Sequence, residues 1–225
     1  GRRIEEIVRF LATRSAGYKR DDIAKKLGLS SGSNVSEMLL SLENADFILP
    51  YTPLGEAKNV TYYRLVDPFC LFYLHFIDGA SSLDEKLFAG ENANSSVRTW
   101  RGFAFENVCF NHIAPIKRAL GIAGVESSQC AYLDRSGQTG QGAQVDMVIQ
   151  RADKVVNLCE MKFVKSPYAH SKEEHDKLLN KEASLERVLS QTATIRFVLV
   201  TTLKMKEGLY ADDFDAVITL DDLFA

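Results

Sequence analysis

The apolar residues in the first part of the chain recur at intervals of three and four, as they do on one face of an amphipathic helix. This spacing predicts helices over about residues 3–14, 20–28 and 33–44. Gly28 closes the second helix, because glycine readily adopts the left-handed conformation that ends a helix. The Ser- and Asn-rich turn after it offers several caps for the third helix. The chain is therefore expected to begin with a three-helix unit.

Two short stretches of aromatic and branched residues, 47–49 and 61–66, follow these helices and predict strands. The proline-containing stretch 50–59 between them predicts the loop of a hairpin. Three helices and a two-stranded hairpin make a winged helix-turn-helix. We therefore predict a winged helix-turn-helix domain over residues 1–80, with a trailing apolar helix over 68–77 that is expected to be buried.

The second part of the chain combines helical spacing with segments of strand character. The predicted order is one helix, three strands, a second helix over about 171–190 and two further strands. This order is typical of an α/β sandwich with a mixed central sheet. The Gly- and Ser-rich composition around residues 81–97 predicts a linker, and residues 98–225 predict the sandwich domain.

Two of these strands form a predicted hairpin that carries the main candidate site. Asp146 lies on one strand, and Glu160 and Lys162 lie on the next. Side chains two positions apart on a strand point to the same face, so Glu160 and Lys162 share a face while Met161 points into apolar packing. Two carboxylates and an amine in this arrangement can hold a divalent metal ion and position a water. Glu106 lies in a mostly apolar helical segment, where a carboxylate is costly unless it is paired or bound to metal.

The composition is that of an ordinary globular protein: 225 residues, 46% hydrophobic and 25% charged. The formal net charge of −3 gives no overall basic signal for nucleic acid. No apolar run reaches the roughly 20 residues of a membrane span, so no membrane partner is expected. The four cysteines are dispersed and are expected to be buried free thiols in a reducing cytoplasm. The chain begins with Gly1 instead of Met, and we expect it to be part of a longer protein.

Acidic and basic residues are equal in number over residues 1–78, and the predicted third helix carries two glutamates and no lysine or arginine. Because phosphate contacts supply most of the affinity for DNA, two roles stay open for this domain: contact with DNA and contact with protein. The candidate nucleic-acid contacts are four basic residues for phosphates and one amide for base edges: Lys19, Arg20, Lys25, Lys58 and Asn34. The alternative is that the basic residues form a solvated helix face.

Further charged residues follow the hairpin. His170 and His175 are five positions apart, a poor spacing for a shared metal site on a helix, and are expected at the surface. Four lysines are candidates for holding substrate phosphates, or they belong to a solvated helix with pairs such as Glu173 and Lys177: Lys165, Lys172, Lys177 and Lys181.

The combination of Glu106 on a helix, Asp146 on a strand and Glu160-Met-Lys162 on the next strand resembles the pattern of the PD-(D/E)XK nuclease superfamily. The resemblance covers about residues 98–222 and implies a restriction-endonuclease-like α/β sandwich. It implies that all four residues are catalytic. The three carboxylates would bind Mg²⁺ or Mn²⁺, and the lysine would orient or deprotonate the attacking water.

A second resemblance extends over almost the whole chain. A winged helix, an apolar helix that begins Asp67-Pro-Phe, and the segments around Glu106, Asp146 and Glu160 are similar to the C-terminal half of a family of prokaryotic AAA-type P-loop ATPases. This resemblance implies DNA as a partner and an N-terminal ATPase domain that is absent from this chain. ATP is then expected only in that domain, because the chain has no Gly-x-x-x-x-Gly-Lys-Ser/Thr. The oligomeric state stays open, and a homo-oligomer is compatible with the sequence.

Two other functions also stay open. The chain can be a non-catalytic regulatory module that binds DNA or protein, in which Lys162 neutralises Asp146 and Glu160 without metal. A winged-helix transcription regulator with a ligand-sensing domain explains the N-terminal part but leaves the four candidate catalytic residues without a role.

Overall fold

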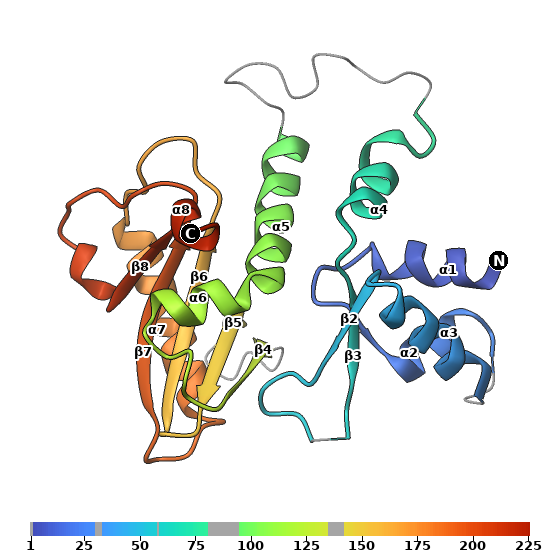
Figure 1. The fold of residues 1–225 in the computed structure, drawn as a ribbon, viewed down its shortest axis with the longest axis horizontal. Helices are drawn as coiled ribbons and strands as arrows, with labels where there is room; N and C mark the ends of the chain where they lie inside the picture. The colour runs from blue at the N-terminus through green and yellow to red at the C-terminus, as the bar shows by residue number, and fades with distance from the viewer. Residues whose placement is uncertain (1, 30–32, 58, 81–94, 135–141) are drawn as a thin grey trace. The chain divides into compact units, whose positions relative to one another are not determined.

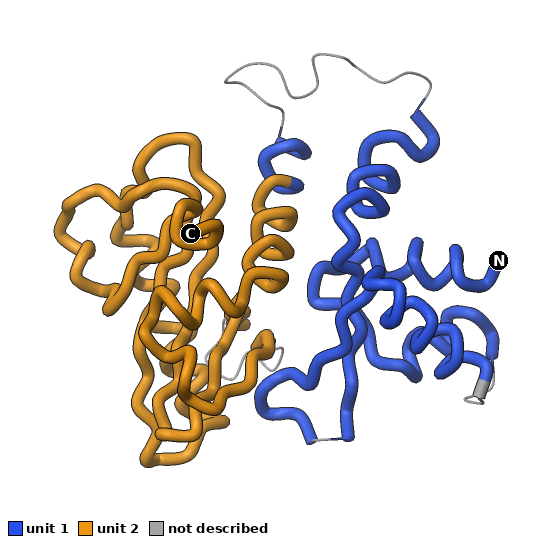
Figure 2. Tube along the Cα trace, viewed as in Figure 1, with its two compact units in different colours: residues 1–100 blue, residues 101–225 orange. Residues whose placement is uncertain are grey.

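A computed structural model of the protein (Figure 1) describes residues 2–29, 33–57, 59–80, 95–134 and 142–225. The chain divides into two compact units, residues 1–100 and residues 101–225 (Figure 2). Most of the predicted linker 81–97 lies outside the described residues, and so does Lys58, one of the predicted nucleic-acid contacts.

Three helices open the first unit, as predicted: α1 (Arg2–Leu11), α2 (Arg20–Lys26) and α3 (Ser33–Asn44). Each helix contributes a fully buried apolar side chain to one shared core, namely Ile7, Ile23 and Leu39. Burial of a side chain of this size contributes about 1.5–3 kcal/mol, so this core holds the short helices together. Gly28 has a φ of +62°, the left-handed conformation predicted for the end of α2.

A small antiparallel sheet lies beside these helices. The predicted hairpin is confirmed as β2 (Ile48–Tyr51) and β3 (Tyr62–Leu65). A third strand, β1 (Tyr18–Lys19), pairs with the other edge of β3 and was not predicted. Gly17 has a φ of +65°, and a β-carbon there would lie 2.0 Å from the backbone oxygen of Tyr63. The close approach of these two segments therefore requires glycine.

The apolar helix after the hairpin is present as α4 (Pro68–Phe72), which continues as the π-helical turn η1 (Tyr73–Ile77). The side chain of Asp67 caps α4 by accepting a hydrogen bond from the backbone of Cys70 at 2.6 Å. The expectation that this helix is buried is wrong, because neither segment contains a buried residue and Phe69 is 69% exposed. One face is half-buried, because Cys70, Leu71 and Leu74 pack against the core of the unit, whereas the Phe69 ring stacks on that of Tyr73.

The elements of the remaining chain follow the predicted order of helix, three strands, helix and two strands, with short additional helices. Their bounds are α5 (Ser95–Asn111), α6 (Ile113–Ala119), β4 (Ser127–Asp134), β5 (Ala143–Arg151), β6 (Val155–Lys162), α7 (Lys172–Glu186), β7 (Thr194–Thr201), η2 (Ala211–Asp213), β8 (Ala216–Thr219) and α8 (Leu220–Leu223).

The five strands of the second unit form one mixed sheet in the order β4-β5-β6-β7-β8. The pairs β4-β5 and β5-β6 are antiparallel, whereas β6-β7 and β7-β8 are parallel. The predicted mixed central sheet is therefore confirmed, and the chain has mixed α and β structure. Strand β6 is buried over most of its length because it lies in the middle of the sheet.

Helices α5 and α7 cover opposite faces of this sheet. Side chains alternate along β6, so Cys159 and Glu160 point to opposite faces. Glu160 contacts Lys181 of α7. Cys159 lies near Cys109 of α5. Burial is the main cause of the raised pKa of Cys109, and the nearby Cys159 raises this pKa further. This two-sided cover is compatible with an α/β sandwich.

None of the helices among the described residues has the length and apolar character needed to cross a membrane.

Candidate carboxylate and lysine site

The predicted site lies at the open end of the β5-β6 hairpin. Val148 of β5 lies opposite Leu158 of β6. Asp146 and Glu160 come directly after the last regular pair, Met147 with Cys159. The register of β5 against β4 shifts between Val145 and Val148, so contacts and not strand alternation place Asp146. The backbone N–H of Met161 donates to Oδ2 of Asp146 at 3.1 Å. This hydrogen bond holds the aspartate against the strand that carries the glutamate.

Glu160 is almost completely buried, with 5% of the residue exposed. Its Oε1 accepts a hydrogen bond from Nζ of Lys181, and Nζ of Lys162 lies 3.8 Å from its Oε2. Burial raises the pKa of Glu160, Lys181 opposes this effect, and the neighbouring Asp146 raises the pKa further. Two adjacent carboxylates in a buried place are costly unless cations compensate them, and these lysines supply that compensation.

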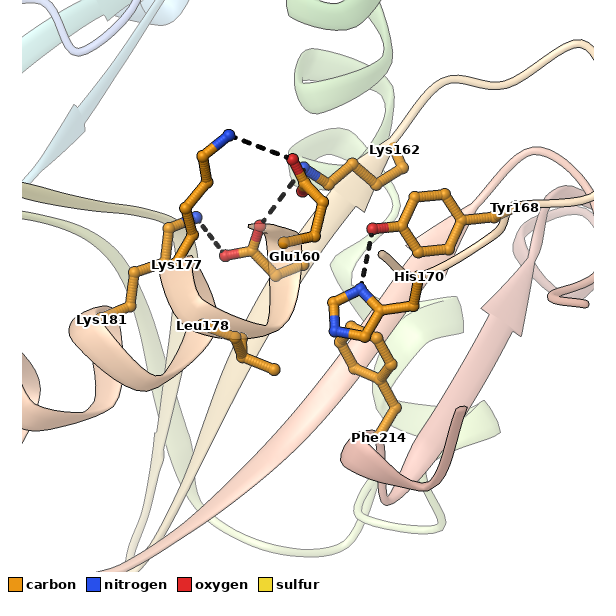
Figure 3. A pocket seen from close by; sticks show the side chains of 9 residues that line it. Glu160, Lys162, Tyr168, His170, Lys177, Leu178, Lys181 and Phe214 are labelled. Carbon is orange, nitrogen blue, oxygen red and sulfur yellow. Dashed lines mark hydrogen bonds and ion pairs between the residues drawn. The ribbon is translucent and has the colours of Figure 1, made fainter. Parts of the chain in front are cut away.

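Lys162 is held by α7 as well as by its own strand (Figure 3). Its Nζ donates to Oε2 of Glu174 at 2.7 Å, and Oε1 of Glu174 accepts from Lys177 at 3.4 Å. Lys177 also pairs with Glu173 at 2.7 Å, which confirms the predicted helical pair. Burial lowers the pKa of Lys162, but the hydrogen bond to Glu174 and the charge of Glu160 outweigh burial and raise it. Lys162 therefore carries a positive charge over the ordinary pH range.

These side chains line one side of a cavity of about 130 Å³, and Tyr168, His170 and Phe214 line another (Figure 3). The Tyr168 hydroxyl lies 3.1 Å from Nδ1 of His170, whose Nε2 lies 3.0 Å from Oδ2 of Asp213. A carboxylate only accepts, so Nε2 of His170 donates to Asp213. Burial raises the pKa of Tyr168 to about 12, and the hydroxyl stays protonated.

The expectation that His170 and His175 lie at the surface is wrong for His170, whose side chain is 3% exposed. Both histidines converge on Oδ2 of Asp213, with Nδ1 of His175 at 2.6 Å. Asp213 is 38 residues beyond His175 in the chain. The spacing of the two histidines therefore held no information about the partner that buries one of them.

Glu106 is half-buried on α5. Burial is the main cause of the raised pKa of Cys109, and the charges of Asp146 and Glu106 add to it, so both carboxylates lie in the neighbourhood of Cys109. Within the described residues, no group of three or more His, Cys, Asp or Glu side chains is placed to hold a metal ion. The catalytic and metal-binding role of Glu106 stays a prediction.

The predicted nucleic-acid contacts of the first unit differ in how firmly they are tied to protein neighbours. Lys19 forms an ion pair with Glu56 at 3.1 Å, and Nε of Arg20 donates to a serine of α3 at 3.0 Å. Lys25 and Asn34 are exposed. Among the described candidates, Lys25 is therefore the lysine best placed for a phosphate, and contact with nucleic acid stays a prediction.

The sequence did not assign Glu174, Lys181 or Tyr168 to the neighbourhood of Glu160. Glu174, Lys177 and Lys181 recur at intervals of three and four, which places them on one face of a helix. The spacing could therefore have grouped these three residues. It could not show that they face Glu160, because that depends on how α7 packs against the sheet.

No protein-family model matches the chain, and no curated protein and no solved structure matches it either. The functional argument therefore depends on the sequence pattern and on the geometry of the described residues.

Proposed function

We propose that this chain is the C-terminal region of a prokaryotic AAA-type ATPase and that its second unit is a Mg²⁺-dependent PD-(D/E)XK nuclease acting on DNA. The observation that carries the proposal is the proximity of Asp146 and Glu160 at the end of the hairpin, with Lys162 two positions after Glu160 on the same face of β6. Phosphodiester hydrolysis needs hard oxygen ligands for a cation and a positive charge beside them. This end of the sheet brings both together.

The order of elements supports the same proposal. The order α5-β4-β5-β6-α7-β7 is that of the αβββαβ core which the sequence resemblance implies. In the first unit, the order α1-β1-α2-α3-β2-β3 is that of a winged helix-turn-helix, with the loop between β2 and β3 as the wing.

The two carboxylates fit a hard divalent cation. One oxygen of Asp146 accepts the N–H of Met161, and among the described residues its other oxygen accepts no hydrogen bond. On Glu160, Oε1 contacts Lys181, whereas the nearest cation to Oε2 is Lys162 at 3.8 Å. One oxygen from each carboxylate is thus available, and Mg²⁺ suits a site with few protein ligands because it keeps several waters.

Lys162 has the position and charge to act on the substrate. When bound, Mg²⁺ lowers the pKa of a coordinated water and stabilises negative charge on a phosphate. The ammonium of Lys162 is fixed by Glu174 at 2.7 Å and stays charged, so it donates to the attacking water or to a phosphate oxygen and does not remove a proton.

The proposal is tested by incubating the chain with single-stranded, duplex and branched DNA in the presence of Mn²⁺ or Mg²⁺. We expect metal-dependent cleavage that is lost in Asp146→Ala and in Lys162→Ala. Lys154→Asn is the matched control, because Lys154 lies in the turn at the far end of the same hairpin and its φ of +67° suits asparagine. Absence of cleavage by the wild type, together with absence of metal binding in calorimetry, contradicts the proposal.

One observation favours a second function, a non-catalytic module that binds DNA or protein. Glu160 and Lys162 already have partners of opposite charge on α7, Lys181 and Glu174, so the cluster is compensated without metal. This function predicts DNA or protein binding that Mn²⁺ and the Asp146→Ala substitution leave unchanged.

A further inference from the structure

The charged side chains around Glu160 form a network of ion pairs in which the sign of the charge alternates. The network runs from the sheet to the outer face of α7. Lys162 lies between Glu160 at 3.8 Å and Glu174 at 2.7 Å, and Lys177 lies between Glu174 at 3.4 Å and Glu173 at 2.7 Å. Exposure of the side chain increases along it, from 6% at Glu160 to 79% at Glu173.

Lys181 lies at the buried end of this network and differs from the other lysines in the number of its carboxylate partners. Lys162 and Lys177 each have a second carboxylate, whereas within the described residues the ion pair of Lys181 is with Glu160 alone. Its side chain is 18% exposed and ends on Oε1 of Glu160. Lys181 therefore holds one oxygen of the carboxylate whose other oxygen is left for the proposed cation (Figure 3).

We propose that Lys181 is an internal counter-ion of the cation site: it occupies Glu160 in the cation-free protein and is displaced when a divalent cation binds between Asp146 and Glu160. This inference rests on the proposed function. A lysine ammonium and a divalent cation at the same carboxylate repel each other, so binding of one disfavours the other. The flexible stem of Lys181 and its partial exposure let the ammonium move into solvent when it leaves.

The proposal predicts how the charge at position 181 controls cation affinity. Lys181→Met keeps the length of the stem and removes the charge, and we expect it to bind Mn²⁺ about tenfold more tightly than the wild type. Lys181→Arg keeps the charge and can bind a carboxylate through two N–H groups, so its affinity is expected to equal that of the wild type or to be weaker. Lys177→Met is the matched control: it removes the same charge one turn away, and an affinity within about twofold of wild type is expected because its partners are Glu173 and Glu174.

The measurement is isothermal titration calorimetry of Mn²⁺ into the whole 225-residue chain and these variants. Tighter binding by Lys181→Met, but not by Lys181→Arg or Lys177→Met, supports the counter-ion. Wild-type binding that Lys181→Met leaves unchanged or weakens overturns the counter-ion and leaves the proposed function standing. If Lys181→Met does not fold, the Mn²⁺ affinity of Lys181→Arg is the test. Tighter binding by that variant overturns the counter-ion role of Lys181. If neither the wild type nor any variant binds Mn²⁺, the proposed function fails and the counter-ion fails with it.

Discussion

Two ion pairs, one from each unit, differ in how deeply they are buried. In the first unit, Arg9 binds both carboxylate oxygens of Asp78, at 2.5 and 3.2 Å, with 40% and 34% of the two side chains exposed. In the second unit, Glu160 and Lys181 are 6% and 18% exposed. Exposed pairs contribute little to stability, whereas removal of one partner of a buried pair leaves an uncompensated charge. The pair of Arg9 and Asp78 is therefore replaceable, whereas loss of Lys181 leaves a buried carboxylate without its closest cation.

The largest effect is expected at the buried pair. In a buffer without divalent cations, Lys181→Met should lower stability by roughly 2–4 kcal/mol, because Glu160 keeps only Lys162 at 3.8 Å. Hydrogen exchange of the β6 amides measures this in the second unit alone. Adding Glu160→Gln should restore most of the loss, since it removes the charge left without its partner. A loss below about 1 kcal/mol would show that Glu160 behaves like a surface carboxylate.

A smaller effect is expected at the edge strand β4. Nη2 of Arg187 donates to Oδ2 of Asp134 at 2.7 Å, with 33% and 7% of the two side chains exposed. Arg187→Met should cost about 1 kcal/mol in urea denaturation, because Asp134 still accepts the hydroxyl of Ser184 at 2.8 Å. If Arg187→Met costs as much stability as Lys181→Met, then burial of the carboxylate alone determines the loss. The proximity of Asp146 and Glu160 would then add nothing to it.

The first unit should respond weakly when its DNA contacts are changed. If Lys25 contacts a phosphate, Lys25→Ala should reduce affinity for duplex DNA a few-fold and reduce the salt dependence by about one counterion. Lys19→Ala is expected to change affinity less, because Lys19 is already paired with Glu56. Fluorescence anisotropy at several salt concentrations measures both. Equal and negligible effects would favour a protein-binding role for this unit.

No measurable effect is expected at the exposed pair of the first unit. Asp78→Ala should leave the denaturation midpoint unchanged at physiological salt, since the pair with Arg9 is screened and open to water. A clear loss of stability in thermal denaturation would remove the contrast between the two units.

Much of the fold could be predicted from periodicity. The order of helices and strands and the shared face of Glu160 and Lys162 follow from spacing within single elements. Strand β1 could not be predicted, because two residues are too few to show an alternation. The exposure of Phe69 on one face of α4 was also missed, since an apolar run records the residue types but not which face another element covers.

The composition of the candidate site was harder to predict than its central motif. Lys181 reaches Glu160 across 21 residues, and Asp213 reaches His170 across 43. Both contacts depend on the rotation and packing of elements against the sheet, which no local pattern encodes. The sequence therefore identified the side chains on the hairpin and missed the side chains that the rest of the unit places around them.

The most direct test is whether Asp146 and Glu160 hold a divalent cation together. Calorimetry with Mn²⁺ on the wild type and on Asp146→Asn addresses this, because asparagine keeps an oxygen that can accept the N–H of Met161 and removes only the charge. We predict one Mn²⁺ site in the wild type and its loss in Asp146→Asn, with both proteins folded. A wild type that binds no Mn²⁺, or a site that Asp146→Asn leaves unchanged, would contradict the shared cation site.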